Sequence, residues 1–188
     1  EVRHAPGRID RVAVEAAANV IAHAAVRHAA QRFHRHLHGP VALGGAILAL
    51  FLGEDAMNAH EQLEFGKGIS DAEEPDLWQK DLTGAIENWI EVGQPEERRI
   101  LKACGRSNQV MIYAYSNSAS IWWKSVEGKL ARAKNLQVMQ IDSSSLPELE
   151  KLCQRSMQLQ VTIQEGEVWI RDEELEIQLQ VTILKSRD

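Results

Sequence analysis

Cysteine is scarce in this sequence of 188 residues, which contains only Cys104 and Cys153. The two do not form a Cys-x-x-Cys pair, so neither a zinc ribbon nor a thioredoxin-like redox motif is indicated. A chain of this length can bury a substantial core without disulfide support. We therefore expect both thiols to be reduced and structural, as is usual in a cytoplasmic protein.

Long hydrophobic runs are also absent. The longest run, VALGGAILALFL, covers residues 41–52, whereas a membrane-spanning helix needs about 20 apolar residues. The run also lies too far along the chain to be the core of an export signal. The sequence therefore predicts no membrane segment and a cytoplasmic localisation.

An excess of positive charge is missing as well. The formal net charge is −6, with 44% hydrophobic and 26% charged residues, which is typical of a soluble globular protein. Such a chain does not bind polyanions through its overall charge. Contact with nucleic acid would need a local basic patch.

Lysine and tryptophan are missing from the N-terminal third, since the first lysine is Lys67 and the first tryptophan is Trp78. All seven histidines, in contrast, lie at or before His60. So abrupt a change in composition marks a boundary near residue 60.

The hydrophobic pattern predicts an α/β (α+β) domain. Strands are expected where apolar residues run continuously or alternate, and helices where they recur at helical spacing. The expected strands cover residues 77–80, 85–92, 110–115 and 136–141. The expected helices cover residues 11–38, 96–104, 118–134 and 146–155, and residues 41–52 form a buried helix or strand. This alternation implies a mixed β-sheet with parallel crossovers, flanked by helices.

The C-terminal region has a different pattern, because apolar and polar residues alternate from residue 159 to residue 183. With a turn at Glu165-Gly166, this predicts an antiparallel β-meander with one polar face. The hexapeptide QLQVTI occurs twice, starting at residues 158 and 178. Two copies are too few for a solenoid, so two equivalent strands of one sheet are the simpler interpretation.

Histidines cluster in HRHLH at residues 34–38. On a helix, only His34 and His38 would share a face and could hold zinc together. A zinc site needs further ligands and an ordered surrounding shell, and no third ligand is evident nearby. A solvated basic helix end is the favoured interpretation.

A pair of carboxylates is the main candidate for chemistry. Pro75-Asp76 precedes one expected strand, and Glu91 lies near the end of the next, in GAIENWIEVGQP at residues 84–95. In metal-dependent phosphodiester hydrolysis, an aspartate and a glutamate at adjacent strand ends hold Mg²⁺. Asp76 and Glu91 would meet if these strands are antiparallel. The alternative is that both are ordinary solvated turn acids.

Basic residues gather on two expected helices. The first helix carries Arg98, Arg99, Lys102 and Arg106, and Lys124, Lys129, Arg132 and Lys134 follow Trp122-Trp123 on the second. A groove that tracks phosphates beside aromatic side chains would have this composition. Two ordinary amphipathic helices with their tryptophans in the core are the favoured interpretation.

Several long strings resemble the YaeQ family of bacterial proteins. They are LEFGKGISDAEEPDLWQKDLTGAIENWIEVGQPEERRILKACGR at residues 63–106, YAYSNSASIWW at 113–123 and MQLQVTIQEGEVWI at 157–170. The resemblance covers about residues 58–185. It implies a variant of the PD-(D/E)xK fold of restriction endonucleases.

Through this resemblance, Asp76 matches the first carboxylate of the nuclease pattern and Glu91 the second, so both are expected to bind Mg²⁺. The pattern normally continues Glu-x-Lys, and the lysine helps to activate the attacking water. Here Gly93 stands in the lysine slot, and Gln94, which follows, is expected near that water. Lys80 and Lys102 are the candidates for a replacement of the lysine.

Two functions follow from this pattern. The first is a Mg²⁺-dependent nuclease or nucleic-acid-processing enzyme with Asp76, Glu91 and Gln94 in its catalytic site. The second is a catalytically inactive nuclease-fold module that binds nucleic acid or a protein partner. The two carboxylates favour the first function, whereas the missing lysine and the acidic net charge favour the second.

The N-terminal segment does not share the resemblance. Residues 1–57 are rich in histidine, alanine and arginine and lack the family's pattern. Either a reading-frame or gene-start error or a replaced N terminus would explain this. We expect one domain over residues 1–188, with a nuclease-fold core at 58–188.

Overall fold

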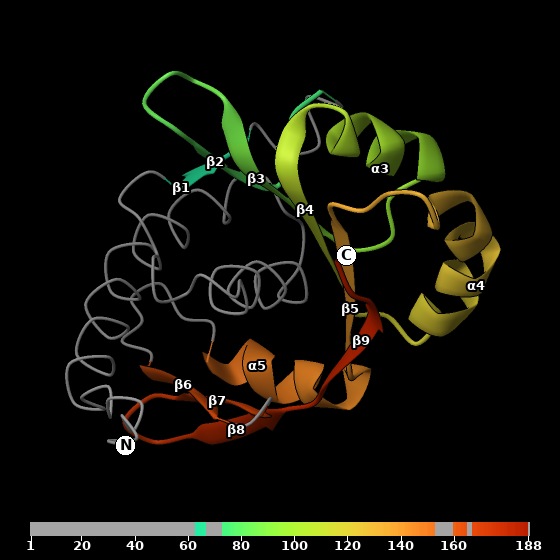
Figure 1. Cartoon of the computed structure of the whole chain (residues 1–188). Coiled ribbons are helices and arrows are strands. Elements are labelled where there is room, and N and C mark those ends of the chain that lie inside the picture. Colours follow the sequence, from blue (N-terminus) through green and yellow to red (C-terminus); the bar gives the residue numbers. More distant parts are fainter. Residues whose placement is uncertain (1–62, 67–72, 153–159, 165–166, 188) are drawn as a thin grey trace, which may run out of the picture.

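Two β-sheets and the helices packed on them form the part of the chain that the structure describes (Figure 1). The computed structural model describes residues 63–66, 73–152, 160–164 and 167–187. The elements expected at residues 11–38 and 41–52, the histidine cluster at 34–38 and Cys153 lie outside these ranges. No helix within them is long and apolar enough to cross a membrane.

The larger sheet has six strands in the order β1-β2-β3-β4-β5-β9. Its strands are β1 (Leu63–Phe65), β2 (Leu77–Lys80), β3 (Ile86–Val92), β4 (Ser107–Ala114), β5 (Leu136–Ile141) and β9 (Val181–Lys185). Strands β3, β4 and β5 are parallel, whereas β1, β2 and β9 run antiparallel to their neighbours. The expected mixed sheet with parallel crossovers is confirmed.

Two helices cover one face of this sheet (Figure 1). Helix α3 (Glu97–Cys104) connects β3 to β4, and helix α4 (Ala119–Leu130) connects β4 to β5. The core between helices and sheet consists of Trp89, Ile100, Ala103, Val110, Ile112, Trp123, Val126, Leu130, Leu136 and Val138. Burial of this apolar surface fixes the position of α3 over the end of β3.

A tight turn joins β2 to β3. One oxygen of the Asp81 carboxylate accepts hydrogen bonds from the Thr83 and Ala85 backbone N–H groups, at 2.8 and 2.9 Å. Gly84 follows with φ of +88°, a conformation that glycine adopts without strain. Asp81 and Gly84 thus reverse the chain and set the antiparallel register of the hairpin.

A second turn joins β3 to α3. Gly93 has φ of +115° and its N–H donates to the Tyr113 carbonyl at 2.9 Å. Pro95 follows, and its carbonyl accepts a hydrogen bond from the Trp122 indole at 3.2 Å. These contacts send the chain from the end of β3 directly into α3, so the first residues of that helix lie near the strand end.

The smaller sheet has three antiparallel strands in the order β6-β7-β8. They are β6 (Gln160–Gln164), β7 (Glu167–Arg171) and β8 (Glu176–Leu179). Helix α5 (Leu146–Leu152) lies along this sheet (Figure 1). Alternate residues of β7 and β8 are buried, namely Val168, Ile170, Ile177 and Leu179, as the period of two predicts.

The expected C-terminal meander is confirmed for β6 to β8 and is wrong for the last strand. Strand β9 leaves the smaller sheet and pairs with β5, with Ile183 opposite Met139 (Figure 1). The crossing point is Gln180, whose carbonyl accepts a hydrogen bond from the Asp142 N–H at 3.0 Å. The second QLQVTI copy therefore spans β8 and β9, so the copies are not equivalent strands of one sheet.

Candidate carboxylate–arginine site

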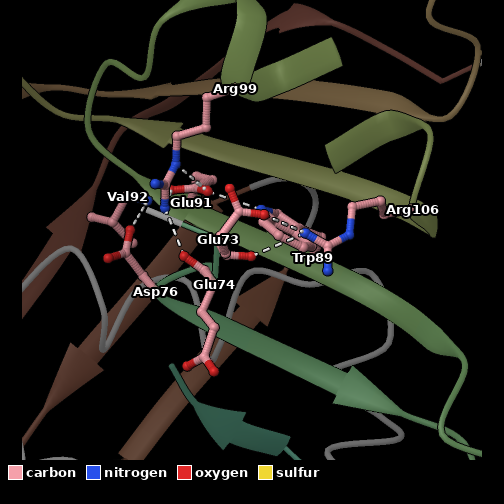
Figure 2. A network of polar contacts seen from close by, with 8 residues as sticks. All are labelled: Glu73, Glu74, Asp76, Trp89, Glu91, Val92, Arg99 and Arg106. Atoms are coloured by element: carbon pink, nitrogen blue, oxygen red, sulfur yellow. Dashed lines mark hydrogen bonds and ion pairs between the residues drawn. The ribbon is translucent and has the colours of Figure 1, made fainter. Parts of the chain in front are cut away.

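Asp76 and Glu91 lie together at one end of the β2–β3 hairpin (Figure 2). Leu77, the first residue of β2, pairs with Ile90, so the residue before β2 lies beside the end of β3. Asp76 Oδ2 accepts a hydrogen bond from the Val92 N–H at 2.7 Å. The antiparallel arrangement that the sequence analysis required for their meeting is therefore present.

The Glu91 side chain is buried and fully engaged. The residue is only 4% exposed. Its Oε1 accepts hydrogen bonds from the Trp89 indole at 2.9 Å and from Arg99 Nε at 2.7 Å, and its Oε2 accepts one from Arg99 Nη2 at 3.1 Å. A buried carboxylate is tolerated when it is paired in this way.

Arg99 joins three parts of the fold (Figure 2). It belongs to α3, it grips Glu91 on β3, and its Nη2 donates to the Glu74 carbonyl at 2.8 Å in the segment before β2. Its side chain remains 29% exposed. The Arg99 side chain thus contacts Glu91 while part of its surface is open to solvent.

The electrostatics of the pair disfavour two adjacent negative charges. Burial raises the pKa of Glu91 above its ordinary value and the charge of Asp76 raises it further, against the hydrogen bonds from Arg99 and Trp89. Burial also raises the pKa of Asp76, although the Val92 N–H and the Arg99 charge oppose this. A cation at this strand end would stabilise both carboxylates in their ionised form.

Gln94 lies beyond the turn at Gly93 and faces a different group. Its side-chain amide donates to Ser116 Oγ and, at 3.2 Å, to Ser118 Oγ. These serines are in the segment between β4 and α4. The structure therefore places Gln94 with Ser116 and Ser118 rather than in a hydrogen bond to Asp76 or Glu91, and the attacking water expected near it stays a prediction.

Neither candidate lysine joins the carboxylate pair. Lys80 pairs with Ile86 at the opposite end of the hairpin, and its ammonium group lies 3.5 Å from the centroid of the Trp78 ring and 3.7 Å from Glu64. Lys102 binds the carboxylate of Glu73. Lys80 was a candidate because it lies on the preceding strand, but that strand is antiparallel to β3 and places Lys80 at the other end of the hairpin from Glu91.

Acidic side chains pair with half of the basic residues that the sequence analysis named, namely Arg99, Lys102, Arg106 and Lys129. Glu73 also contacts Arg106 at 3.4 Å, and Glu97 binds Lys129 at 2.6 Å. Trp123 is part of the core and Trp122 packs against it. These contacts agree with two amphipathic helices that pack their tryptophans inward.

Arg99 is the member of the site that the sequence analysis did not single out. It appeared only as one of four basic residues on an expected helix. One signal in the sequence could have identified Arg99: it lies in the first turns of a helix that begins shortly after β3, the strand that carries Glu91. In the described ranges, no three or more histidine, cysteine, aspartate or glutamate side chains are placed so that they could together hold a metal ion.

Comparison with known proteins identifies the family. The model of the family described as YaeQ protein matches residues 51–181. The uncharacterized protein YaeQ of Salmonella typhi is 40% identical over 125 residues, which cover 66% of this chain and 69% of that protein. Its namesake in Escherichia coli K12 is 36% identical over the same shares of both chains.

Solved structures agree. The crystal structure of the YaeQ protein from Xanthomonas axonopodis pv. citri matches with a TM-score of 0.73 and 36% identity, over 80% of this chain and 82% of that chain. The YaeQ protein from Pseudomonas syringae matches with a TM-score of 0.69 and 29% identity, over 81% and 83%. With the family model covering most of its length, this chain belongs to the YaeQ family.

Proposed function

We propose that the chain adopts a variant of the PD-(D/E)xK nuclease fold and is a Mg²⁺-dependent nuclease or nucleic-acid-processing enzyme. The observation that carries the proposal is the convergence of Asp76 and Glu91, from the start of β2 and the end of β3, at one strand end. This is the arrangement in which the nuclease pattern holds its metal.

The residues present suit Mg²⁺ in type and number. The ion prefers oxygen ligands and is often held by one or two carboxylates, with waters completing its shell. Asp76 engages one oxygen with the Val92 N–H. Glu91 can offer Oε2 once Arg99 Nη2 releases it, because Trp89 and Arg99 Nε contact the other oxygen. Asp76 and Glu91 would therefore be the protein ligands.

The chemistry asked of this site is hydrolysis of a phosphodiester. The water oxygen forms a bond to phosphorus and gives one proton to solvent. The bond from phosphorus to the leaving sugar oxygen breaks, and that oxygen takes up a proton from solvent. The bound ion would supply polarisation of the phosphate and a lower pKa of the attacking water. Asp76 and Glu91 fix the position at which this occurs, and the positive charge of Arg99 lies beside it.

A second candidate function is favoured by one specific observation. Both oxygens of Glu91 are held by Arg99, and the lysine slot is occupied by Gly93. Such a site can persist as a salt-bridged remnant in a catalytically inactive module. The module would then bind nucleic acid or a protein partner without cleaving it.

Thermal melting with added Mg²⁺ or Mn²⁺ tests the metal site. A ligand that binds only the folded state stabilises it by about 2.7 kcal/mol at 100 times its Kd. We expect the wild type to be stabilised and both Asp76→Asn and Glu91→Gln to lose the stabilisation. Glu87→Gln is the matched control, because Glu87 lies on the same strand and binds Asn108 at the other end.

A cleavage assay on labelled single- and double-stranded DNA and RNA then separates the two functions. Metal-dependent cleavage that Glu91→Gln abolishes supports the nuclease. Metal binding without cleavage of any substrate, or absence of metal binding in the wild type, contradicts it and favours the inactive module.

A further inference from the structure

We infer that Arg99 takes the place of the missing motif lysine: it holds Glu91 while the site lacks a divalent cation, and it turns to the substrate phosphate once a cation binds Glu91. This inference rests on the proposed function. It assigns the positive charge of the site to helix α3 rather than to strand β3.

The backbone excludes a lysine from its usual slot in this fold. Gly93 has φ of +115°, in the region where residues with a side chain are strained. Its N–H is also tied to the Tyr113 carbonyl at 2.9 Å, which holds that conformation. The end of β3 therefore cannot present a cationic side chain at this position without a change of backbone.

Other nearby cations are committed elsewhere. Lys80 lies at the far end of the hairpin, and Lys102 and Arg106 bind Glu73. Arg106 also lies 5.5 Å from the centroid of the Trp89 ring. Among the described residues, Arg99 is the cation that hydrogen-bonds to the carboxylate pair.

The contact between Arg99 and Glu91 makes the guanidinium group a competitor of the metal. Arg99 Nη2 occupies Glu91 Oε2 at 3.1 Å, and that oxygen is the one without a second donor. A divalent cation that coordinates Oε2 must displace this hydrogen bond. Binding of the cation to Glu91 and the pair of hydrogen bonds from Arg99 to Glu91 therefore oppose each other.

The charge of the site supports the exchange. A divalent cation adds two positive charges beside Asp76, Glu91 and Arg99, which makes the site more attractive to the single negative charge of a phosphodiester. The released guanidinium is well suited to grip phosphate oxygens with two parallel hydrogen bonds. The Arg99 side chain as a whole is 29% exposed, so part of it is open to an approaching phosphate.

Manganese binding to variants of Arg99 tests the competition. Isothermal titration should give a Kd for Arg99→Gln that is about tenfold lower than that of the wild type, in the range usual for coupled sites. Arg98→Gln is the matched control on the same helix, at an exposed position, and should bind Mn²⁺ as the wild type does. If the role of Arg99 is structural only, its loss lowers the melting temperature and leaves the Kd unchanged.

Oligonucleotide binding tests the second half of the inference. With Ca²⁺ in place of Mg²⁺ to suppress cleavage, we expect Arg99→Gln to bind a labelled single strand about tenfold more weakly. Arg99→Lys keeps the positive charge with a less suitable geometry, so its oligonucleotide affinity should lie between those of the wild type and Arg99→Gln. It also serves as the folded variant if Arg99→Gln does not fold. Equal oligonucleotide affinity in wild type, Arg99→Lys and Arg99→Gln overturns the inference.

The two failures are distinguishable. If neither the wild type nor any Arg99 variant binds Mn²⁺, the proposed metal site is wrong and the inference falls with it. If the wild type binds Mn²⁺ and Arg99→Gln binds it with the same Kd, the metal site stands and the inference alone is wrong. If Mn²⁺ binds only to Arg99→Gln, the wild type holds no metal, so the proposed function is contradicted and the inference falls with it.

Discussion

The contact between Glu91 and Arg99 should be measurable as a coupling in stability. Removing one partner of a buried ion pair costs about 3–5 kcal/mol, because the other charge stays buried. Glu91 is 4% exposed, whereas the Arg99 side chain is 29% exposed and therefore partly hydrated. We therefore expect Arg99→Gln to lower the free energy of unfolding by about 2–3 kcal/mol.

The change Glu91→Gln should cost less. A glutamine at this position still offers an oxygen to the Trp89 indole and to Arg99, and the remaining arginine is partly hydrated. We expect a loss of about 1–2 kcal/mol. In the double variant neither Glu91 nor Arg99 is left without its partner, so the combined loss should fall short of the sum by about 1–2 kcal/mol.

Urea denaturation followed by circular dichroism, with a chelator present, measures all four proteins. A shift in midpoint at constant slope reports a change in stability rather than in the unfolded state. Arg98→Gln should lie within about 0.5 kcal/mol of the wild type. If the losses of Glu91→Gln and Arg99→Gln add within about 0.3–0.5 kcal/mol, the pair does not interact in solution and the argument built on it is refuted.

Three further predictions concern single residues. Ile100→Ala removes a fully buried side chain of α3 and should cost about 2–5 kcal/mol in urea denaturation, whereas Leu101→Ala at its exposed neighbour should cost under about 1 kcal/mol. Burial raises the pKa of Cys104 from 9.0 to about 11, so in a Cys153→Ser protein its thiolate is about 100-fold scarcer; a thiol reagent should label it slowly until denaturant is added. Burial raises the pKa of Asp76, so the folded state holds the proton of this carboxyl more tightly than the unfolded chain does. The stability that this proton contributes is lost as the pH rises through the folded-state pKa. The free energy of unfolding of Asp76→Asn relative to wild type should increase as the pH rises above 3.8, and a decrease would contradict the assignment.

The central sheet could be predicted because its strand ends carry strong local signals. The bounds of β2 and β5 match the sequence prediction at both ends, since polar residues that favour turns, Asp81 and Asp142, follow each strand directly. Strand β4 begins at Ser107, before the expected residue 110. Its first residues are polar, and they become strand only by pairing with β3.

The path of the C-terminal strands could not be predicted in the same way. An alternating pattern shows that a segment is a half-buried strand but does not name the strand with which it pairs. Only Gln180 separates β8 from β9, so no long linker announces the change of sheet. The short β1 was also missed, because a strand of three residues carries too little pattern.

The carboxylate pair could be predicted because it depends on local connectivity. A residue just before one strand and a residue near the end of the next must meet when the two form a hairpin, and Asp76 and Glu91 do so. Arg99 depends instead on how α3 packs over the sheet, which is set by long-range burial. The same reasoning explains why Lys80, close in sequence, lies at the wrong end of the hairpin.

Stability alone is a weak explanation for the combination of Asp76, Glu91 and Arg99. Replacing a buried ion pair by apolar side chains of similar volume is often neutral or stabilising, because desolvation offsets most of the attraction. A second carboxylate beside the pair adds repulsion, as the influence of Asp76 on the pKa of Glu91 shows. A fold that needed only packing at this strand end would gain by omitting one acid. A positively charged ligand at this strand end would explain why both acids are present, and this is why we propose that Asp76, Glu91 and Arg99 form a functional site.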